Sequence, residues 1–371
     1  MPLYLTEDQA MLRDTAREFM AGEGSIAGQL RKYRDMGCKD GFGHALWKQM
    51  AELGFTGVLI GEADGGLGLG HVEAGIVLEE IGRNLTPSPF LISAVAVVEA
   101  MKGTPHAQRW FPGILAGDTV AALAVDEGPK HRPEAIAMRA ERAGNGFRLS
   151  GRKQFVVQGA SADVVVVAAR TDEGLTLFAV EKESKGLDVE GVRLVDSSIG
   201  ARLDFRDVEV NADAVIGEVG GGEAVLGRVL NAGRAGAASE MVGLGSAAMG
   251  MTVDYLRQRK QFGKLIGEFQ VLQHRSAHLY SELEIARSAA LKAQQLLDEG
   301  SPEAEAMVSV AKAKAGRAST LAVQEGVQMH GGIGMTDEYD IGLYMKRDRA
   351  LNELFGDSNY HADKLARMKG Y

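Results

Sequence analysis

The sequence predicts an α+β chain of three parts: an N-terminal α-helical domain over residues 1–118, a middle antiparallel β-barrel over 119–220, and a C-terminal four-helix bundle over 221–371. Three observations predict this order. Apolar residues first recur at helical spacing, then form short β-branched or alternating runs between polar clusters, and return to helical spacing after Gly222. A chain of 371 residues is also too long for one small core.

The first part begins with a helix signal. Thr6 and Gln9 have the spacing of a capping box, in which each side chain binds the other residue's backbone amide. Leu12, Ala16 and Phe19 then share one face of the expected helix. Further helices are expected over 43–53, 71–83, 88–101 and 106–116.

The middle part is expected to consist of strands. The strand-like runs cover 120–125, 146–157, 162–169, 175–180 and 203–210. Because the intervals between them do not read as helices, an antiparallel sheet or barrel is favoured over a doubly wound parallel sheet.

The last part reads as long amphipathic helices. Three apolar stripes step by three and four residues, and they include Met241, Leu244, Ala248, Met251 and Tyr255, then Phe269, Leu272, Leu279, Leu283, Ala286 and Ala290, then Val308, Ala311, Ala315, Ala318 and Ala322. A fourth helix is expected over 338–369. Narrow stripes rich in alanine predict an up-and-down bundle with closely spaced axes.

Composition excludes several classes of partner. With 41 Lys and Arg against 50 Asp and Glu, the net charge of −9 offers no basic field for nucleic acid or an anionic membrane. The longest uncharged stretch, 84–98, is shorter than the roughly 18 apolar residues of a membrane-inserted helix. One cysteine, Cys38, and a start without secretory-signal character predict a cytoplasmic protein. His71, His274 and His278 do not form a metal-ligand set, so no metal is expected.

Two short segments of the last part suggest a ligand site. Arg259-Lys260-Gln261-Phe262-Gly263-Lys264 places a guanidinium and an ammonium at a corner between helices, where a new helix N-terminus could help to bind a pyrophosphate. Gln328-Met329-His330-Gly331-Gly332 ends a helix with glycines that allow close approach of a ligand. It is neither a Walker loop nor a Rossmann fingerprint. Arg-Lys at a helix end is more often a partner of the helix dipole, and Gly-Gly is more often an ordinary turn, so the residue patterns alone do not establish a ligand site.

The chain resembles the acyl-CoA dehydrogenase family over essentially its whole length. The resemblance rests on residues 53–57 with 65–68, 79–83, 151–153, 259–270 and 328–339. It implies the three-part fold above, usually assembled as a dimer of dimers, with FAD as cofactor. It also implies α,β-dehydrogenation of an acyl-CoA thioester and transfer of the electrons to an electron-transfer flavoprotein. In this reaction a carboxylate removes an α-proton while the β-hydride passes to the flavin, and the carbonyl is polarised as charge builds up on it.

Carried over residue by residue, the resemblance assigns two sets of binding residues. The set matching positions that bind the FAD of a neighbouring subunit comprises Arg259, Phe262, Gln270, Gln328, Gly331 and Gly332. On the substrate side, Arg234 matches the arginine of the bundle's first helix, with Asn231 shortly before it. Asn359 matches a further position that contacts FAD.

The chain's own flavin segments depart from the family pattern. Val-Asp-Glu-Gly-Pro-Lys-His-Arg at 125–132 aligns with the family's Thr-Glu-Pro-x-Ala-Gly-Ser-Asp run. The family's Trp-Ile-Thr/Ser triplet beside the flavin ring becomes Phe155-Val156-Val157. Phe155 therefore keeps an apolar wall for the flavin, whereas Val157 lacks the hydroxyl near flavin N5.

The catalytic base is the sharpest departure. The usual glutamate falls on Phe355, and the alternative base position, directly before Arg234, is Gly233. Neither accepts a proton, although the Phe355 amide N–H could still supply half of the family's carbonyl clamp. Asp357 is the nearest carboxylate and the first candidate base, with a cofactor or structural role as the competing interpretation. Glu240 is the second candidate, with a polar contact between helices as the competing interpretation.

These departures leave more than one function open. The first hypothesis is an FAD-dependent acyl-CoA dehydrogenase that works through Asp357 or another base. The pattern at 355–361, Phe-Gly-Asp-x-x-x-His, also resembles the small subunits of bacterial pimeloyl-CoA dehydrogenases and related heteromeric acyl-CoA dehydrogenases. The second hypothesis is therefore a non-catalytic subunit that lends FAD-binding residues to a glutamate-bearing partner, so that either a homo-oligomer or a heteromer is expected. A third, oxidase-like proton abstraction by an aspartate, rests on Asp357 alone.

Overall fold

The computed structural model describes residues 3–371, which divide into two compact units. The bundle unit comprises the chain up to residue 31 with 71–86 and 234–371, and the sheet unit comprises 32–70 with 87–233. Each unit combines separate stretches of the chain, so this division does not test the predicted consecutive domains 1–118, 119–220 and 221–371, which stay a prediction.

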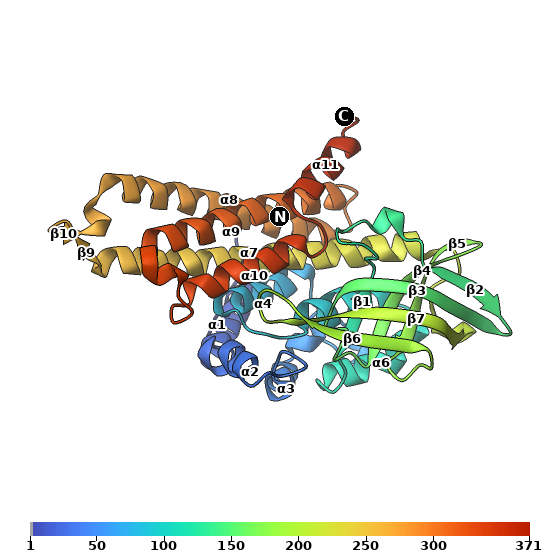
Figure 1. Ribbon diagram of the computed structural model, residues 1–371. Helices are drawn as coiled ribbons and strands as arrows, with labels where there is room; N and C mark the ends of the chain where they lie inside the picture. The colour runs from blue at the N-terminus through green and yellow to red at the C-terminus, as the bar shows by residue number, and fades with distance from the viewer. Residues whose placement is uncertain (1–2) are drawn as a thin grey trace. The chain divides into compact units, whose positions relative to one another are not determined.

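Long helices form most of the bundle unit, as predicted. They are α1 (Glu7–Gly22), α4 (His71–Asn84), α7 (Gly222–Gln258, which belongs to this unit from residue 234), α8 (Gln270–Asp298), α9 (Ala304–His330), α10 (Ile341–Glu353) and α11 (Ser358–Met368). Helices α7 to α10 run alongside one another (Figure 1). The expected single helix over 338–369 is wrong, because Phe355 and Gly356 adopt φ angles of 61° and 102° and break it into α10 and α11.

Local signals and small residues account for this packing. The capping box at α1 is confirmed: the Gln9 amide donates to Thr6 Oγ1 at 3.2 Å, and the Thr6 amide donates to Gln9 Oε1 at 3.0 Å. A Cβ atom on Gly82 would lie 2.0 Å from the Glu240 carbonyl oxygen, and one on Gly243 would lie 1.9 Å from the Glu79 carbonyl oxygen. Helices α4 and α7 therefore touch backbone to backbone, as the small residues of the stripe allow.

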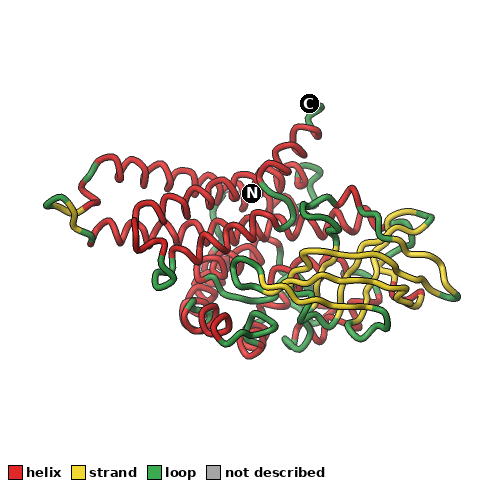
Figure 2. Tube along the Cα trace, viewed as in Figure 1, coloured by secondary structure: helices red, strands yellow, loops and turns green. Residues whose placement is uncertain are grey.

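The sheet unit carries shorter helices and one sheet. The helices are α2 (Lys32–Asp35), α3 (His44–Glu52), α5 (Val98–Met101) and α6 (Pro105–Leu115), and a π-helical segment, Phe90–Val97, precedes α5. The strands are β1 (Ala121–Ala124), β2 (Arg139–Ala143), β3 (Gly146–Val157), β4 (Val164–Thr171), β5 (Gly174–Glu181), β6 (Leu187–Arg193), β7 (Ile199–Asn211) and β8 (Val215–Ile216). Figure 2 shows them as one twisted sheet. A two-stranded hairpin, β9 (Lys260–Gln261) with β10 (Lys264–Leu265), belongs to the bundle unit.

The predicted antiparallel barrel needs two corrections. Across the described residues the strand order runs β6-β7-β3-β2-β4-β5-β8, and the end strands β6 and β8 do not pair, so the sheet is not closed. The sheet is also mixed, because β4 pairs in parallel with β1 and with β2. Parallel neighbours need a long crossover. Here the β2–β3 hairpin supplies it in place of a helix, which is why the absence of helical intervals misled the prediction.

No helix within residues 3–371 combines the length and the apolar character required to cross a membrane.

Candidate functional site

The Arg259 corner, residues 259–270, links α7 to α8 in the bundle unit. Phe262 and Gly263, with φ angles of 54° and 78°, form the tight turn of the β9–β10 hairpin. The Phe262 ring is 91% exposed and lies edge-on to Phe269, with ring centroids 6.3 Å apart. Arg259 is exposed, and its guanidinium makes no ion pair within residues 3–371. Gln270 opens α8 at the same corner, also exposed. The corner thus presents an unpaired cation and an uncovered aromatic ring side by side in the chain.

The glycine loop, residues 331–334, lies at the C-terminal end of α9. Gly331 has a φ angle of 65°, and a Cβ atom on Gly331 or Gly332 would meet nothing within 4 Å. Gln328 is exposed on the last turn of α9. The open space over these glycines leaves room for a ligand to reach their backbone.

An aromatic stack connects this loop to the helix that leads into the corner. The His330 ring stacks on Tyr255, near the end of α7, with centroids 4.5 Å apart, and also contacts Tyr339 at 4.8 Å. His330 Nδ1 donates to the Gly326 carbonyl oxygen at 2.7 Å, and burial lowers the pKa of His330. The two segments that the sequence singled out, far apart in the chain, therefore lie at one end of the bundle unit.

The Phe355 turn, residues 354–357, lies between α10 and α11. Phe355 is 5% exposed, and its carbonyl oxygen accepts hydrogen bonds from Arg234 Nε at 3.1 Å and His361 Nε2 at 3.1 Å. Within residues 3–371 the amide N–H of Phe355 donates to no acceptor. Buried backbone amides without a partner are rare in folded proteins, so this one is a candidate donor to a ligand.

Both candidate bases are engaged in structural contacts. Asp357 is the N-cap of α11, and its Oδ1 accepts the amides of Asn359 at 3.0 Å and Tyr360 at 2.8 Å. Glu240 is 2% exposed and receives two hydrogen bonds from Arg347 of α10, at 2.9 and 2.6 Å. A carboxylate stabilised as an anion by amides or by a guanidinium is a weaker proton acceptor.

The remaining site residues are also described. Arg234, 2% exposed, lies in α7 on the bundle side and places its guanidinium carbon 5.6 Å from the centre of the Tyr360 ring. Asn231 is half-buried one turn earlier, and Asn359 is exposed in the first turn of α11. In the sheet unit, Phe155 and Val157 are half-buried on β3, next to the core residue Val156. Phe155, with a φ of 53°, lies in a β-bulge between Lys153 and Val156.

The acidic side chains of residues 125–132 are engaged in hydrogen bonds within the sheet unit. Asp126 accepts from His131 Nδ1 at 2.9 Å, and Glu127 accepts from Lys153 Nζ at 2.7 Å and from two backbone amides of 137–138. The segment lines a cavity of about 430 Å³, and its basic side chains Lys130 and Arg132 are among the lining residues. Burial lowers the pKa of Lys153, against the opposing effect of Glu127.

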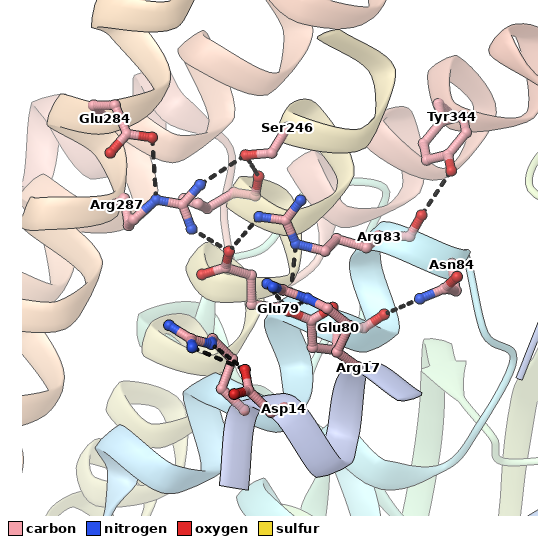
Figure 3. Close-up of polar contacts among 12 residues, drawn as sticks. Asp14, Arg17, Glu79, Glu80, Arg83, Asn84, Ser246, Glu284, Arg287 and Tyr344 are labelled. Carbon is pink, nitrogen blue, oxygen red and sulfur yellow. Dashed lines mark hydrogen bonds and ion pairs between the residues drawn. The ribbon is translucent and has the colours of Figure 1, made fainter. Parts of the chain in front are cut away.

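A second cavity, of about 380 Å³, is lined by charged residues of the bundle unit. Figure 3 shows Arg287 and Arg83 converging on Glu79, and Arg17 on Glu80. Burial alone would raise the pKa of Glu79, but Arg287 and Arg83 outweigh burial and lower it. Because the acidic and basic groups pair with one another, this cluster mainly joins α1, α4 and α8.

Sequence reasoning missed Lys312, and it named His361 only as the last residue of the pattern at 355–361. Lys312 of α9 is fully buried and donates to the carbonyl oxygens of Leu351 at 3.0 Å, Asn352 at 3.4 Å and Gly356 at 3.0 Å. The sequence does contain a signal for a buried lysine. Lys312 lies four residues after Val308 and three before Ala315, so it shares the apolar stripe of this helix. A lysine at a core position of a helix is rarely left without partners.

Comparisons with known proteins agree along the whole chain. Family models for the N-terminal, middle and C-terminal domains of acyl-CoA dehydrogenase match residues 6–118, 126–208 and 220–369. The chain is 32% identical to the mitochondrial isovaleryl-CoA dehydrogenase of Solanum tuberosum over 327 residues, covering 83% of this chain and 78% of the relative. It is 30% identical to the cyclohex-1-ene-1-carbonyl-CoA dehydrogenase of Geobacter metallireducens over 373 residues, covering 96% of each. The solved acyl-CoA dehydrogenase from Geobacillus kaustophilus superposes with a TM-score of 0.90 at 25% identity, covering 99% of both chains.

Proposed function

Because this chain belongs to the acyl-CoA dehydrogenase family, we propose that it serves the FAD-dependent α,β-dehydrogenation of an acyl-CoA thioester, without the usual glutamate base on its own chain. Members of the family are oxidoreductases that act on a CH–CH group, and their cofactor is FAD. The observation that carries the proposal is the joint position of the Arg259 corner and the glycine loop at one end of the bundle unit.

The residues at that end fit part of an FAD molecule. Arg259 is a free guanidinium, the group best suited to two phosphate oxygens at once, and Phe262 is an exposed ring on which a purine can stack. Gln328 and the open backbone at Gly331 and Gly332 supply hydrogen-bonding groups beside them. FAD, when bound, supplies the flavin that accepts the β-hydride of the substrate. Residues 125–132 fit less well, because Asp126 and Glu127 would oppose phosphate groups.

On the substrate side, the Phe355 turn supports a carbonyl-binding role. The free Phe355 amide could donate to the thioester oxygen, whose negative charge grows as the α-proton leaves. Arg234 holds the carbonyl oxygen of the same residue, so it acts by orienting the turn. The proton itself requires a base, and Asp357 remains the candidate nearest in sequence.

The purified chain tests this proposal directly. A yellow preparation with one FAD per chain, bleached anaerobically by isovaleryl-CoA, would support it. A colourless chain that does not take up added FAD, or a flavoprotein that no acyl-CoA reduces, would contradict it.

A second function is favoured by the contacts of the two carboxylates. Asp357 caps α11 and Glu240 pairs with Arg347, so neither is free to act as a base. We propose as the alternative a non-catalytic small subunit that lends Arg259 and Gln328 to the FAD of a glutamate-bearing partner. Co-expression with such a homologue should then give a heterotetramer with fewer flavins than chains. One FAD in every copy of the isolated chain would exclude this alternative.

Several finer features belong to the same proposal. An electron-transfer flavoprotein is the expected acceptor, the working assembly is a homotetramer or heterotetramer, and the protein acts in the cytoplasm. The three domains 1–118, 119–220 and 221–371 are proposed as its folding units. Reduction of an added electron-transfer flavoprotein by acyl-CoA would test the acceptor.

A further inference from the structure

The Phe355 turn has a strained backbone that other residues must stabilise. Phe355, with a φ of 61°, adopts the left-handed region, which is sterically unfavourable for a non-glycine residue. Gly356 follows at 102°, and a Cβ atom there would lie 2.4 Å from the Tyr360 ring. Strain of this kind persists only where surrounding contacts determine the conformation.

Lys312 supplies the contact that links this turn to the end of α10. Its ammonium has three N–H groups, and each has a carbonyl acceptor: Leu351 and Asn352 in the last turn of α10, and Gly356 in the strained turn. The carbonyls at a helix C-terminus lack partners within the helix and carry the negative end of its dipole. One buried cation therefore ties the end of α10 to the residue that follows Phe355.

Two further side chains bind the carbonyl oxygen of Phe355 itself. Arg234 from α7 and His361 from α11 both donate to this oxygen at 3.1 Å. Burial, then the positive charges of Arg234 and Lys312, lower the pKa of His361 to about 2, so His361 donates as a neutral imidazole. The two peptide groups that follow Phe355 and Gly356 are thus held through their carbonyl oxygens, while the Phe355 amide N–H stays unbonded within residues 3–371.

We propose that Lys312 is a positioning residue for the Phe355 amide: by holding the Gly356 carbonyl against the end of α10, its ammonium aims that amide at the thioester carbonyl of the substrate. The substrate part of this inference rests on the proposed function, whereas the positioning of the turn does not. Nothing in the reaction requires Lys312 to touch the substrate, and it acts only through the turn.

Protonation of Lys312 should control the turn. Burial, and secondly Arg234, lower the pKa of Lys312 to about 7, against the opposing effect of Asp348, Asp357 and Glu353. His361 is the remaining titratable group near it and is neutral above pH 3 or so, given its pKa of about 2. Above pH 7 the neutral amine has two N–H groups and a lone pair for three carbonyls, so one hydrogen bond is lost.

The same proton has the opposite effect on global stability. Because the pKa of Lys312 is lower in the folded chain than in the unfolded chain, the unfolded chain binds more protons between about pH 7 and pH 10. This residue's contribution to stability therefore rises with pH in that window, while the order of the turn falls.

Hydrogen exchange, followed by mass spectrometry on the full chain, tests the proposal without any ligand. Between pH 6 and 9, protection of residues 354–360 in the wild type should fall about three- to tenfold after correction for intrinsic exchange, the factor expected for one lost hydrogen bond. Lys312→Met should lack this pH dependence and show low protection throughout. Lys314→Met is the matched control, since Lys314 lies on the same helix but pairs with Glu282. Flat protection in the wild type would overturn the proposal even if Lys312→Met fails to fold, and so would wild-type protection in a folded Lys312→Met.

Binding of isovaleryl-CoA to the FAD-loaded chain adds the functional readout. Affinity should weaken by a similar factor above pH 7 in the wild type, and at all pH values in Lys312→Met. If the wild type does not bind isovaleryl-CoA, the proposed function fails while the exchange result still decides the role of Lys312. Binding that is unchanged in Lys312→Met, despite a loosened turn, would overturn the link from the turn to the substrate.

Discussion

Replacing Phe355 by glutamate should raise the dehydrogenase activity of this chain. The position is 5% exposed on the turn held by Arg234 and His361, and it is where the family resemblance places the base. Burial would raise the pKa of the new carboxyl group, while the charges of Arg234 and Lys312 would lower it. The new side chain supplies the proton acceptor that Phe355 lacks.

The substitution should change both the stability of the chain and its rate of flavin reduction. Removing the buried ring forfeits roughly 1.5–3 kcal/mol of transfer free energy, which is less than the stability of about 5–15 kcal/mol typical of folded proteins. The variant should therefore fold with a lowered melting temperature. A positioned general base contributes about 10²–10⁴-fold to rate, so flavin reduction by acyl-CoA should accelerate at least about a hundredfold.

The assay is anaerobic reduction of the FAD-saturated chain by isovaleryl-CoA, followed by loss of flavin absorbance. Phe355→Gln is the matched control, because it has nearly the same shape as Phe355→Glu and cannot accept the proton. Equal reduction rates in the two variants would refute the reasoning that places the missing base at this position.

Three other substitutions probe separate features of the chain. Arg259→Ala should weaken FAD binding about 10- to 100-fold, the loss expected for a charge-assisted hydrogen bond; unchanged affinity in a fluorescence titration would rule out the corner as a phosphate site. Arg347→Ala removes two hydrogen bonds and an ion pair from the buried carboxylate of Glu240, so urea unfolding should show about 3–5 kcal/mol less stability; a loss below about 1 kcal/mol would contradict that description. Gly243→Ala would place a Cβ atom 1.9 Å from a backbone oxygen of α4 and should destabilise the chain by at least about 1–3 kcal/mol. Gly250→Ala, in the same helix with open space around it, should instead stabilise by about 0.5–1 kcal/mol, and equal effects of the two changes would argue against close contact of α4 and α7.

Most helices of this chain could be predicted because their signals are local. The capping box at Thr6 and the three- and four-residue steps of the apolar stripes act within a few turns of helix, and the helices that they indicate correspond to α1, α7, α8 and α9. The strands β2, β6 and β8 were missed. Strands β2 and β6 alternate little in apolar character, and β8 has only two residues.

The candidate site divides in the same way. The Arg259 corner and the glycine loop could be found because each is a short contiguous segment with distinctive residue types. The contacts of Asp357 and Glu240 could not, since the α11 cap and the Arg347 pair are visible only once α7, α10 and α11 are placed. Lys312 was hidden for the same reason, because its three acceptors lie about 40 residues farther along the chain.

The sequence by itself determined the order of helical and strand regions, the membership of a flavin-dependent family, and a phenylalanine at position 355, where the family resemblance places the base. Each of these depends on residue identity or on periodicity over a few residues. The tertiary structure decided the parallel pairing of β1 with β4, the break between α10 and α11, and the unbonded Phe355 amide among Arg234, Lys312 and His361. These features arise from contacts between segments tens to more than a hundred residues apart, and no local pattern records which distant group will satisfy a buried donor or acceptor.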